Sequence, residues 1–142
     1  TDCGAFLNEA RHGHFKTLFL TGGYPNRDWL SPDEGEALSK IDPLVTADLF
    51  AGPATKNATF VLPTASFAEK DGTFVNFKNL AQAIRRAGKS PNEARSEGQI
   101  FSDLLDRRGL FQIAKVREEM ATEVGFFGGI KGGTGDSGVK LG

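Results

Sequence analysis

Three short segments of this sequence contain residues whose types and spacing suit ligand binding or catalysis. Gly22-Gly23 ends an apolar run, and a glycine turn between a strand and a helix can hold a phosphate on its backbone N–H groups. Asp48 follows a second apolar run and could accept hydrogen bonds from a ligand. Glu69-Lys70-Asp71 brings two carboxylates close together, which is a pattern used in general acid–base catalysis.

Each of these groups also has a purely structural interpretation, which we favour. Neither G-x-G-x-x-G nor a Lys-Ser/Thr pair follows Gly22-Gly23, so a tight turn explains the two glycines. An aspartate after a strand, such as Asp48, is commonly a turn or cap residue. The charges of Glu69-Lys70-Asp71 precede Gly72 in a hydrophilic turn, where we expect them to be solvated.

Other reactive side chains stand alone. His12 and His14 are close in sequence, but a metal site needs a third ligand, so we expect two surface histidines. Cys3 cannot form an internal disulfide, and we expect it to be a small packing residue. Arg85-Arg86 could meet an acidic partner subunit or form a solvated face. The sequence therefore predicts neither a catalytic residue nor a metal ligand.

The elements that would position these residues follow an α/β order. A helix over residues 5–14 precedes apolar runs at residues 17–21, 44–47 and 58–62, which we interpret as short buried strands. Ser31-Pro32 followed by two acids is a helix start, and this helix should extend to about Lys40. This alternation predicts a small, mainly parallel sheet flanked by helices.

The second half of the chain is expected to be less regular. Asp71-Gly72 should turn into a strand ending near Phe77, and a polar loop should occupy residues 78–96. Helices over residues 97–107 and 110–124 carry apolar stripes and should pack over the sheet. We therefore place an α/β domain at residues 1–124 and a Gly-rich segment at 125–142, which is either a flexible linker or lies against something else.

Composition excludes several classes of protein. The 142 residues suffice for one core. A net charge of −1 argues against nucleic-acid binding. The single cysteine excludes a disulfide scaffold, and no apolar window is long enough for membrane insertion. We expect a soluble, cytoplasmic protein, cut from a longer chain because it begins with Thr rather than Met.

From Asp48 to Arg95 the sequence resembles the molybdopterin oxidoreductase family, in particular the large iron–sulfur subunit (G or 75 kDa chain) of the NADH:quinone oxidoreductase of respiratory complex I. The matches form an Asp-apolar segment, an apolar-Leu-Pro strand and a Glu-x-x-Gly-Thr-x-x-Asn motif. They are Asp48, Leu49, Phe50, Ala58, Phe60, Val61, Leu62, Pro63, Glu69, Gly72, Thr73, Asn76 and Gln82. Residues 93–95 and Ile100 match the segment before the family's next helix, and residues 116–121 and 135–142 resemble the quinone-reductase branch.

The departures from the family pattern fall on polar positions. Where the family has Thr-Glu-Thr, this chain has Gly52-Pro53-Ala54, and Lys78-Asn79-Leu80 replaces Glu-Gly-Arg. A pterin dinucleotide needs buried polar partners, and leaving them unpaired costs about 1–3 kcal/mol each. We therefore expect that no pterin is held here.

The resemblance implies a structural and docking role without a redox centre or cofactor, beside other subunits of a respiratory or oxidoreductase complex on the cytoplasmic side of the membrane. The alternative is half of a molybdopterin guanine dinucleotide site in an enzyme such as a formate dehydrogenase. Its contacts would be Gly22, Gly23, Asp48, Gly72 and Asn76.

A free-standing interaction module is a third possibility. The family draws further strands from upstream sequence, so with 12 Phe we expect this fragment to self-associate or to bind a partner subunit rather than to be a clean monomer.

Overall fold

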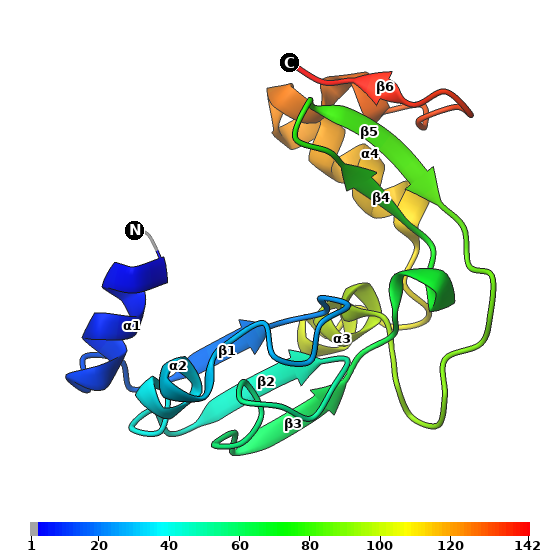
Figure 1. Ribbon diagram of the computed structural model, residues 1–142. Coiled ribbons are helices and arrows are strands. Elements are labelled where there is room, and N and C mark those ends of the chain that lie inside the picture. Colours follow the sequence, from blue (N-terminus) through cyan, green and yellow to red (C-terminus); the bar gives the residue numbers. More distant parts are fainter. Residues whose placement is uncertain (1–2) are drawn as a thin grey trace. The chain divides into compact units, whose positions relative to one another are not determined.

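The computed structural model describes residues 3–142, and the chain divides into two compact units. The first unit is the chain up to Ser66 together with Asn92–Arg95. The second unit consists of Phe67–Pro91 and Ser96–Gly142. Each unit has its own three-stranded sheet (Figure 1).

The sheet of the first unit is parallel. It contains β1 (Leu18–Thr21), β2 (Leu44–Asp48) and β3 (Phe60–Pro63) in that order. The three apolar runs identified in the sequence are therefore strands of one sheet, and the predicted α/β class with a small parallel sheet is confirmed. β2 is largely buried and lies between β1 and β3, so its last residue, Asp48, is placed between the ends of two neighbouring strands.

Two helices accompany this sheet, α1 (Cys3–Arg11) and α2 (Pro32–Ala37). The Ser31 hydroxyl accepts a hydrogen bond from the Glu34 N–H, and the Glu34 carboxylate accepts one from the Ser31 N–H, at 3.3 and 2.8 Å. This capping box confirms the predicted start of the helix. The helix ends at Ala37, earlier than expected. Both helices share one core with the sheet, built on Leu7, Ala10, Leu30, Ala37, Leu38, Ile41, Leu44 and Ala54.

The sheet of the second unit is antiparallel and was not predicted. It contains β4 (Gly72–Val75), β5 (Leu80–Ile84) and β6 (Val139–Lys140) in that order. The expected polar loop over residues 78–96 is wrong, because β5 lies within it. Its two alanines are weak strand formers, yet Ala81 is fully buried, so packing rather than propensity makes this strand.

The second unit also contains α3 (Glu97–Leu104), α4 (Ile113–Glu123) and two short 3₁₀ turns, η1 (Phe67–Glu69) and η2 (Gly125–Ile130). Both predicted helices exist but are shorter than expected, and Asp106 adopts a left-handed φ of 53° after α3. The apolar stripe assigned to α3 is mostly exposed, with only Ile100 of its members buried. Their predicted packing over the parallel sheet stays a prediction.

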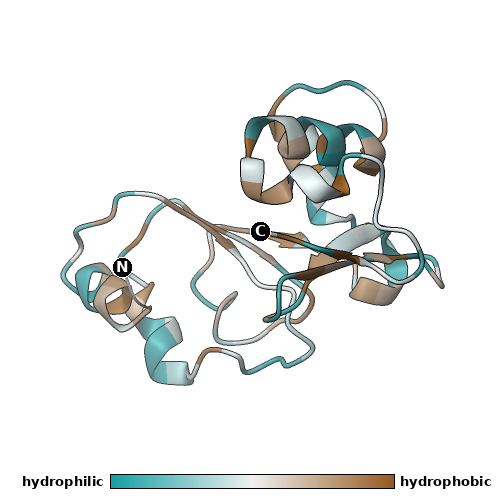
Figure 2. Cartoon of the chain, turned by 90° about the horizontal axis from the view of Figure 1, so that it is seen from above, coloured by the Kyte–Doolittle hydropathy of each residue, from teal (hydrophilic) through white to brown (hydrophobic). Residues whose placement is uncertain are grey.

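The C-terminal segment is part of the second unit. β6 pairs with β5, and Ile130 and Leu141 are buried in a core with Ala81 and Ala121. The interpretation of this segment as a flexible linker is therefore wrong, since Ile130 and Leu141 pack within the chain and the segment ends in a paired strand. In Figure 2 the strands are drawn largely in brown, the hydrophobic end of the scale, whereas the helices mix teal and brown.

The edge strand β3 exposes large apolar side chains. Phe60 is 60% exposed and Val61 50% exposed. Such an edge is a common site of strand addition, and the expected self-association of the fragment stays a prediction.

Candidate functional site

The carboxyl ends of β1 and β2 bring Gly22, Gly23 and Asp48 together. The Gly23 N–H donates to Asp48 Oδ1 at 3.2 Å. A Cβ atom at Gly22 would lie 2.5 Å from the Cγ atom of Asp48, so only glycine leaves room for this carboxylate. Two of the groups selected from the sequence therefore form one cluster. We call this cluster the Asp48 edge and include in it Trp29, whose indole N–H also bonds to Asp48.

The Asp48 carboxylate is buried, with the residue 5% exposed, and it is bonded by groups of its own chain. Oδ1 also accepts the Leu49 N–H at 2.7 Å, and Oδ2 accepts the Trp29 indole N–H at 2.8 Å. Three N–H groups thus offset the cost of burying the carboxylate. A ligand at this position would have to compete with donors that are already in place.

Trp29 was missed by the sequence reasoning. It lies 19 residues before Asp48, and no local motif links an indole N–H to an acceptor at that separation. The only available signal is that Trp29 is the single tryptophan of the chain, and a buried indole N–H usually has a partner.

The Gly52-Pro53-Ala54 loop follows β2, and its polar backbone groups are largely used within the chain. The Gly52 N–H donates to Thr55 Oγ1 at 3.0 Å, and the Thr46 hydroxyl donates to the Ala54 carbonyl at 3.1 Å. The hollow beside the loop is open and lined partly by Arg27, Lys56 and Pro53. The loop side chains themselves supply no hydrogen-bonding group.

One buried polar atom near the Asp48 edge has no partner. Thr64, directly after β3, is 4% exposed, and its N–H donates to the Asp48 carbonyl at 3.0 Å. Its hydroxyl Oγ1 has no hydrogen-bond partner within the described residues. An unpaired buried hydroxyl is costly, so this atom is a candidate contact for a ligand.

The remaining candidates of the family resemblance lie in the second unit. Gly72 pairs with Ile84 in the antiparallel sheet. The Asn76 side-chain oxygen accepts the N–H groups of Lys78 and Leu80 at 2.9 and 3.0 Å, which closes the β4–β5 hairpin. Gly72 therefore serves as a strand residue, and the Asn76 side-chain oxygen serves to close the hairpin.

The charged turn at residues 69–71 is organised by hydrogen bonds. Lys70 Nζ lies 2.7 and 2.6 Å from the two carboxylate oxygens of Glu97, and these side chains are only 18% and 23% exposed. Asp71 Oδ1 accepts the Arg86 N–H at 3.0 Å. The interpretation of these charges as fully solvated is wrong for Lys70, because it forms a half-buried ion pair.

The histidines are exposed, as expected. His12 Nδ1 lies 2.8 Å from the Asn8 carbonyl, and His14 pairs with Glu9. The hydrogen bond from His14 and then its charge hold the pKa of Glu9 below its usual value. Cys3 is exposed, so its assignment as a packing residue is wrong.

Residues 3–142 contain no group of three His, Cys, Asp or Glu side chains arranged to bind a metal ion. Within the same residues, no helix has the length and apolar character needed to cross a membrane.

Comparison with known proteins assigns a family to most of the chain. The molybdopterin oxidoreductase family model matches residues 4–107. The F420-dependent formate dehydrogenase subunit alpha of Methanocaldococcus jannaschii is 42% identical over 74 residues, which cover 52% of this chain and 11% of that protein.

Two further relatives have different chemistry. The NADPH-Fe(3+) oxidoreductase subunit alpha of Geobacter sulfurreducens is 32% identical over 110 residues, covering 75% of this chain and 13% of that protein. A NADH-quinone oxidoreductase subunit of Rhizobium meliloti is 30% identical over 105 residues, covering 70% of this chain and 12% of that protein. The chain thus spans only about an eighth of the length of these relatives.

Proposed function

We propose that this chain, which belongs to the molybdopterin oxidoreductase family, is a structural and docking part of a complex I-type NADH:quinone oxidoreductase large subunit and has no redox centre of its own. The similarity to a NADH-quinone oxidoreductase subunit of Rhizobium meliloti supports this proposal. The activity, the partner subunits and the cytoplasmic location of the whole protein are parts of the same proposal.

The observation that carries the proposal is the closed Asp48 edge. The Asp48 carboxylate already accepts N–H groups from Gly23, Leu49 and Trp29. An open cofactor site would keep such an acceptor free for its ligand. Here it ties the loop after β1 to the end of β2, which is a structural role.

The side chains at this edge do not fit a pterin dinucleotide. That group carries two phosphates and a donor-rich ring system, so its site needs several polar partners. Gly52, Pro53 and Ala54 provide no polar side chain, and the N–H of Gly52 is already bonded to Thr55 Oγ1. A bound dinucleotide would leave polar atoms unpaired, at a cost of about 1–3 kcal/mol each.

Elemental analysis of the purified chain tests this proposal. We expect molybdenum, tungsten and iron to be far below one atom per chain. We also expect no saturable binding of guanosine diphosphate, a probe of the nucleotide half of a dinucleotide site, in isothermal titration calorimetry. Stoichiometric metal or saturable binding of this probe would contradict the proposed role.

A second candidate function is half of a pterin dinucleotide site in an enzyme such as a formate dehydrogenase. It is favoured by the unpaired hydroxyl of Thr64 beside Asp48 and by the similarity to a formate dehydrogenase subunit alpha. Because the loop side chains are not polar, the remaining contacts would come from the backbone of Gly22 and Gly23. The N–H groups of these two glycines are bonded to the Ala47 carbonyl and to Asp48, so a ligand would have to displace these bonds or use the glycine carbonyls.

Paired threonine substitutions separate the two candidates. Thr64→Val removes the unpaired hydroxyl at the Asp48 edge, whereas Thr73→Val removes an unpaired hydroxyl from the second unit. Under the second candidate, guanosine diphosphate binds and only Thr64→Val weakens the binding. Under the first, neither variant binds the probe, and both become slightly more stable because a buried unpaired group is gone.

A further inference from the structure

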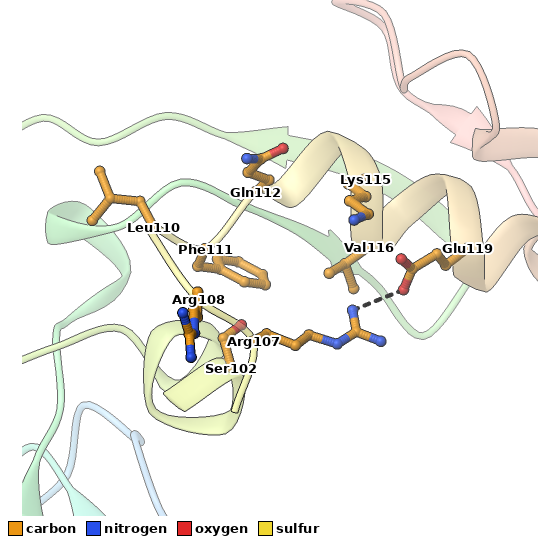
Figure 3. Close-up of a pocket in the computed structure, with 9 residues that line it drawn as sticks. All are labelled: Ser102, Arg107, Arg108, Leu110, Phe111, Gln112, Lys115, Val116 and Glu119. Carbon is orange, nitrogen blue, oxygen red and sulfur yellow. Dashed lines mark hydrogen bonds and ion pairs between the residues drawn. The ribbon is translucent and has the colours of Figure 1, made fainter. Parts of the chain in front are cut away.

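A hollow lies between the end of α3 and the start of α4, and cationic side chains outnumber carboxylates among the residues that line it. Arg107, Arg108 and Lys115 line it, and Glu119 is the single carboxylate among its lining residues. Phe111 forms part of its wall, so we call it the α3–α4 hollow (Figure 3). The chain as a whole has a net charge of −1, which makes this excess of cations local.

One of the three cations is neutralised within the chain. Arg107 Nη1 lies 2.9 Å from the Glu119 carboxylate, and Figure 3 shows its side chain extended toward α4. The described residues provide no hydrogen bond or ion pair for the side chains of Arg108 and Lys115. Two exposed cations therefore remain available beside the same hollow.

The wall of the hollow is held in place by specific contacts. The Gln99 side chain accepts the Phe111 N–H at 2.7 Å and donates to the Gly109 carbonyl at 3.1 Å, which clamps the connecting loop onto α3. A Cβ atom at Gly98 would lie 2.5 Å from the Phe111 ring, so glycine lets the ring pack directly against the helix. The hollow is thus preformed, which lowers the entropic cost of binding.

The start of α4 adds to the local positive potential. Its N-cap residue, Gln112, makes no side-chain cap hydrogen bond, and its first turn contains no acidic residue. The positive end of the helix dipole is therefore not offset by a side chain of its own turn.

Exposed leucines occur in the same stretch of chain, and one of them, Leu110, lines the hollow beside these charges. Leu110 in the connecting loop is 85% exposed, and Leu104 and Leu105 at the end of α3 are 63% and 68% exposed. A free inorganic anion could use the two cations but not this apolar surface. A peptide that carries both acidic and apolar side chains could use both, and contact with it would remove Leu110 from water.

We propose that the α3–α4 hollow is the docking surface for a segment of another protein subunit that carries both acidic and aliphatic side chains. Carboxylates of the segment pair with Arg108 and Lys115, and an apolar side chain covers Leu110 and Phe111. This inference rests on the proposed docking role and names the chemistry of the partner.

Fluorescence anisotropy with a labelled peptide of four Glu-Leu repeats tests the inference on the full chain. We expect saturable binding, which Arg108→Glu combined with Lys115→Glu weakens by about tenfold or more, since reversing charges at a complementary contact is costly. Arg85→Glu combined with Arg86→Glu is the matched control, because it reverses an exposed basic pair in the same unit. The control should bind like the unmodified chain.

Two further probes define the ligand class. A peptide of eight glutamates and inorganic phosphate should each bind much more weakly than the Glu-Leu peptide. The inference is overturned if the Glu-Leu peptide does not bind, if both double variants weaken it equally, or if phosphate or the all-glutamate peptide binds equally well. Failure of the proposed function appears instead in the metal analysis and the guanosine diphosphate titration, neither of which involves this hollow.

Discussion

The Asp48 edge and the α3–α4 hollow both contain charged side chains, but only at the Asp48 edge is the charge fully hydrogen-bonded by groups of the chain itself. At the Asp48 edge one buried carboxylate receives three N–H groups of its own chain. At the hollow, Arg108 and Lys115 are exposed, and the single lining carboxylate is engaged by Arg107. A polar cluster that is internally satisfied stabilises the fold, whereas one with unmatched charges is suited to binding.

Replacement of Asp48 should have the largest effect on stability. Asp48→Ala leaves three N–H donors without their acceptor, and we expect the free energy of unfolding of the first unit to fall by about 3 kcal/mol. Trp29 is the only tryptophan, so denaturation followed by its fluorescence reports on this unit. Asp48→Asn keeps one acceptor oxygen and should lose less. A loss below about 1 kcal/mol for Asp48→Ala would show that the hydrogen bonds to Asp48 do not stabilise the first unit.

Replacement of Gly22 should have the next largest effect. Gly22→Ala places a Cβ atom 2.5 Å from the Asp48 carboxylate carbon, so the carboxylate must move and its hydrogen bonds lengthen. We expect a loss of about 1–3 kcal/mol in denaturant unfolding. Gly88→Ala is the control, since nothing lies within 4 Å of the added atom. Equal effects of the two substitutions would refute the close-packing explanation.

The ion pair between Lys70 and Glu97 tests whether the second unit also contains satisfied charges. A double-mutant cycle with Lys70→Met and Glu97→Gln should give a coupling energy of about 1 kcal/mol, because the pair is partly shielded from water. Unfolding is followed here by circular dichroism, since the tryptophan lies in the first unit. A coupling indistinguishable from zero would show that pairing Lys70 with Glu97 adds nothing to stability, and would contradict the view that this ion pair is a stabilising polar contact of the second unit.

The smallest expected effect is the pH dependence of the Ser31–Glu34 capping box. Hydrogen bonds from the Ser31 backbone and then from its side chain hold the pKa of Glu34 below its usual value. The stabilisation is therefore present above the unfolded-state pKa and is lost as the pH falls through the lower, folded-state pKa. An NMR titration should show Glu34 protonating at lower pH than an unstructured glutamate.

A stability comparison checks the same capping box. Glu34→Gln should lower the melting temperature slightly at neutral pH, and this difference should shrink in acid. Glu36→Gln, in the same helix but outside the capping box, is the control. A difference that grows in acid would contradict the sign of the linkage.

Features set by neighbouring residues were predictable. Ser31, Pro32 and Glu34 specify a helix start because the groups that bond to one another lie within one turn. The apolar runs of β1, β2 and β3 identify buried strands, since each run is short and bounded by turn residues. The placement of Gly22 and Asp48 at strand ends follows from the same runs.

Features that join distant residues were not predictable. β5 lies in a stretch whose polar residues predict a loop, and it is paired on both sides only when β4 and β6 are in place. The burial of Leu141 in the glycine-rich C-terminal segment accompanies the same pairing. The shielding of Lys70 likewise depends on Glu97, which is 27 residues away.

The order of amino acids was enough to specify the local hydrogen bonds, the succession of elements in the first unit and the resemblance to a family now shown over residues 4–107. Folding was needed to bring the Trp29 indole to the Asp48 carboxylate and to leave Arg108 and Lys115 beside one hollow. Capping and periodicity act between residues a few positions apart, so they can be recognised along the chain. A partner for a buried charge depends instead on register and packing between separate elements, which exist only once the chain has folded.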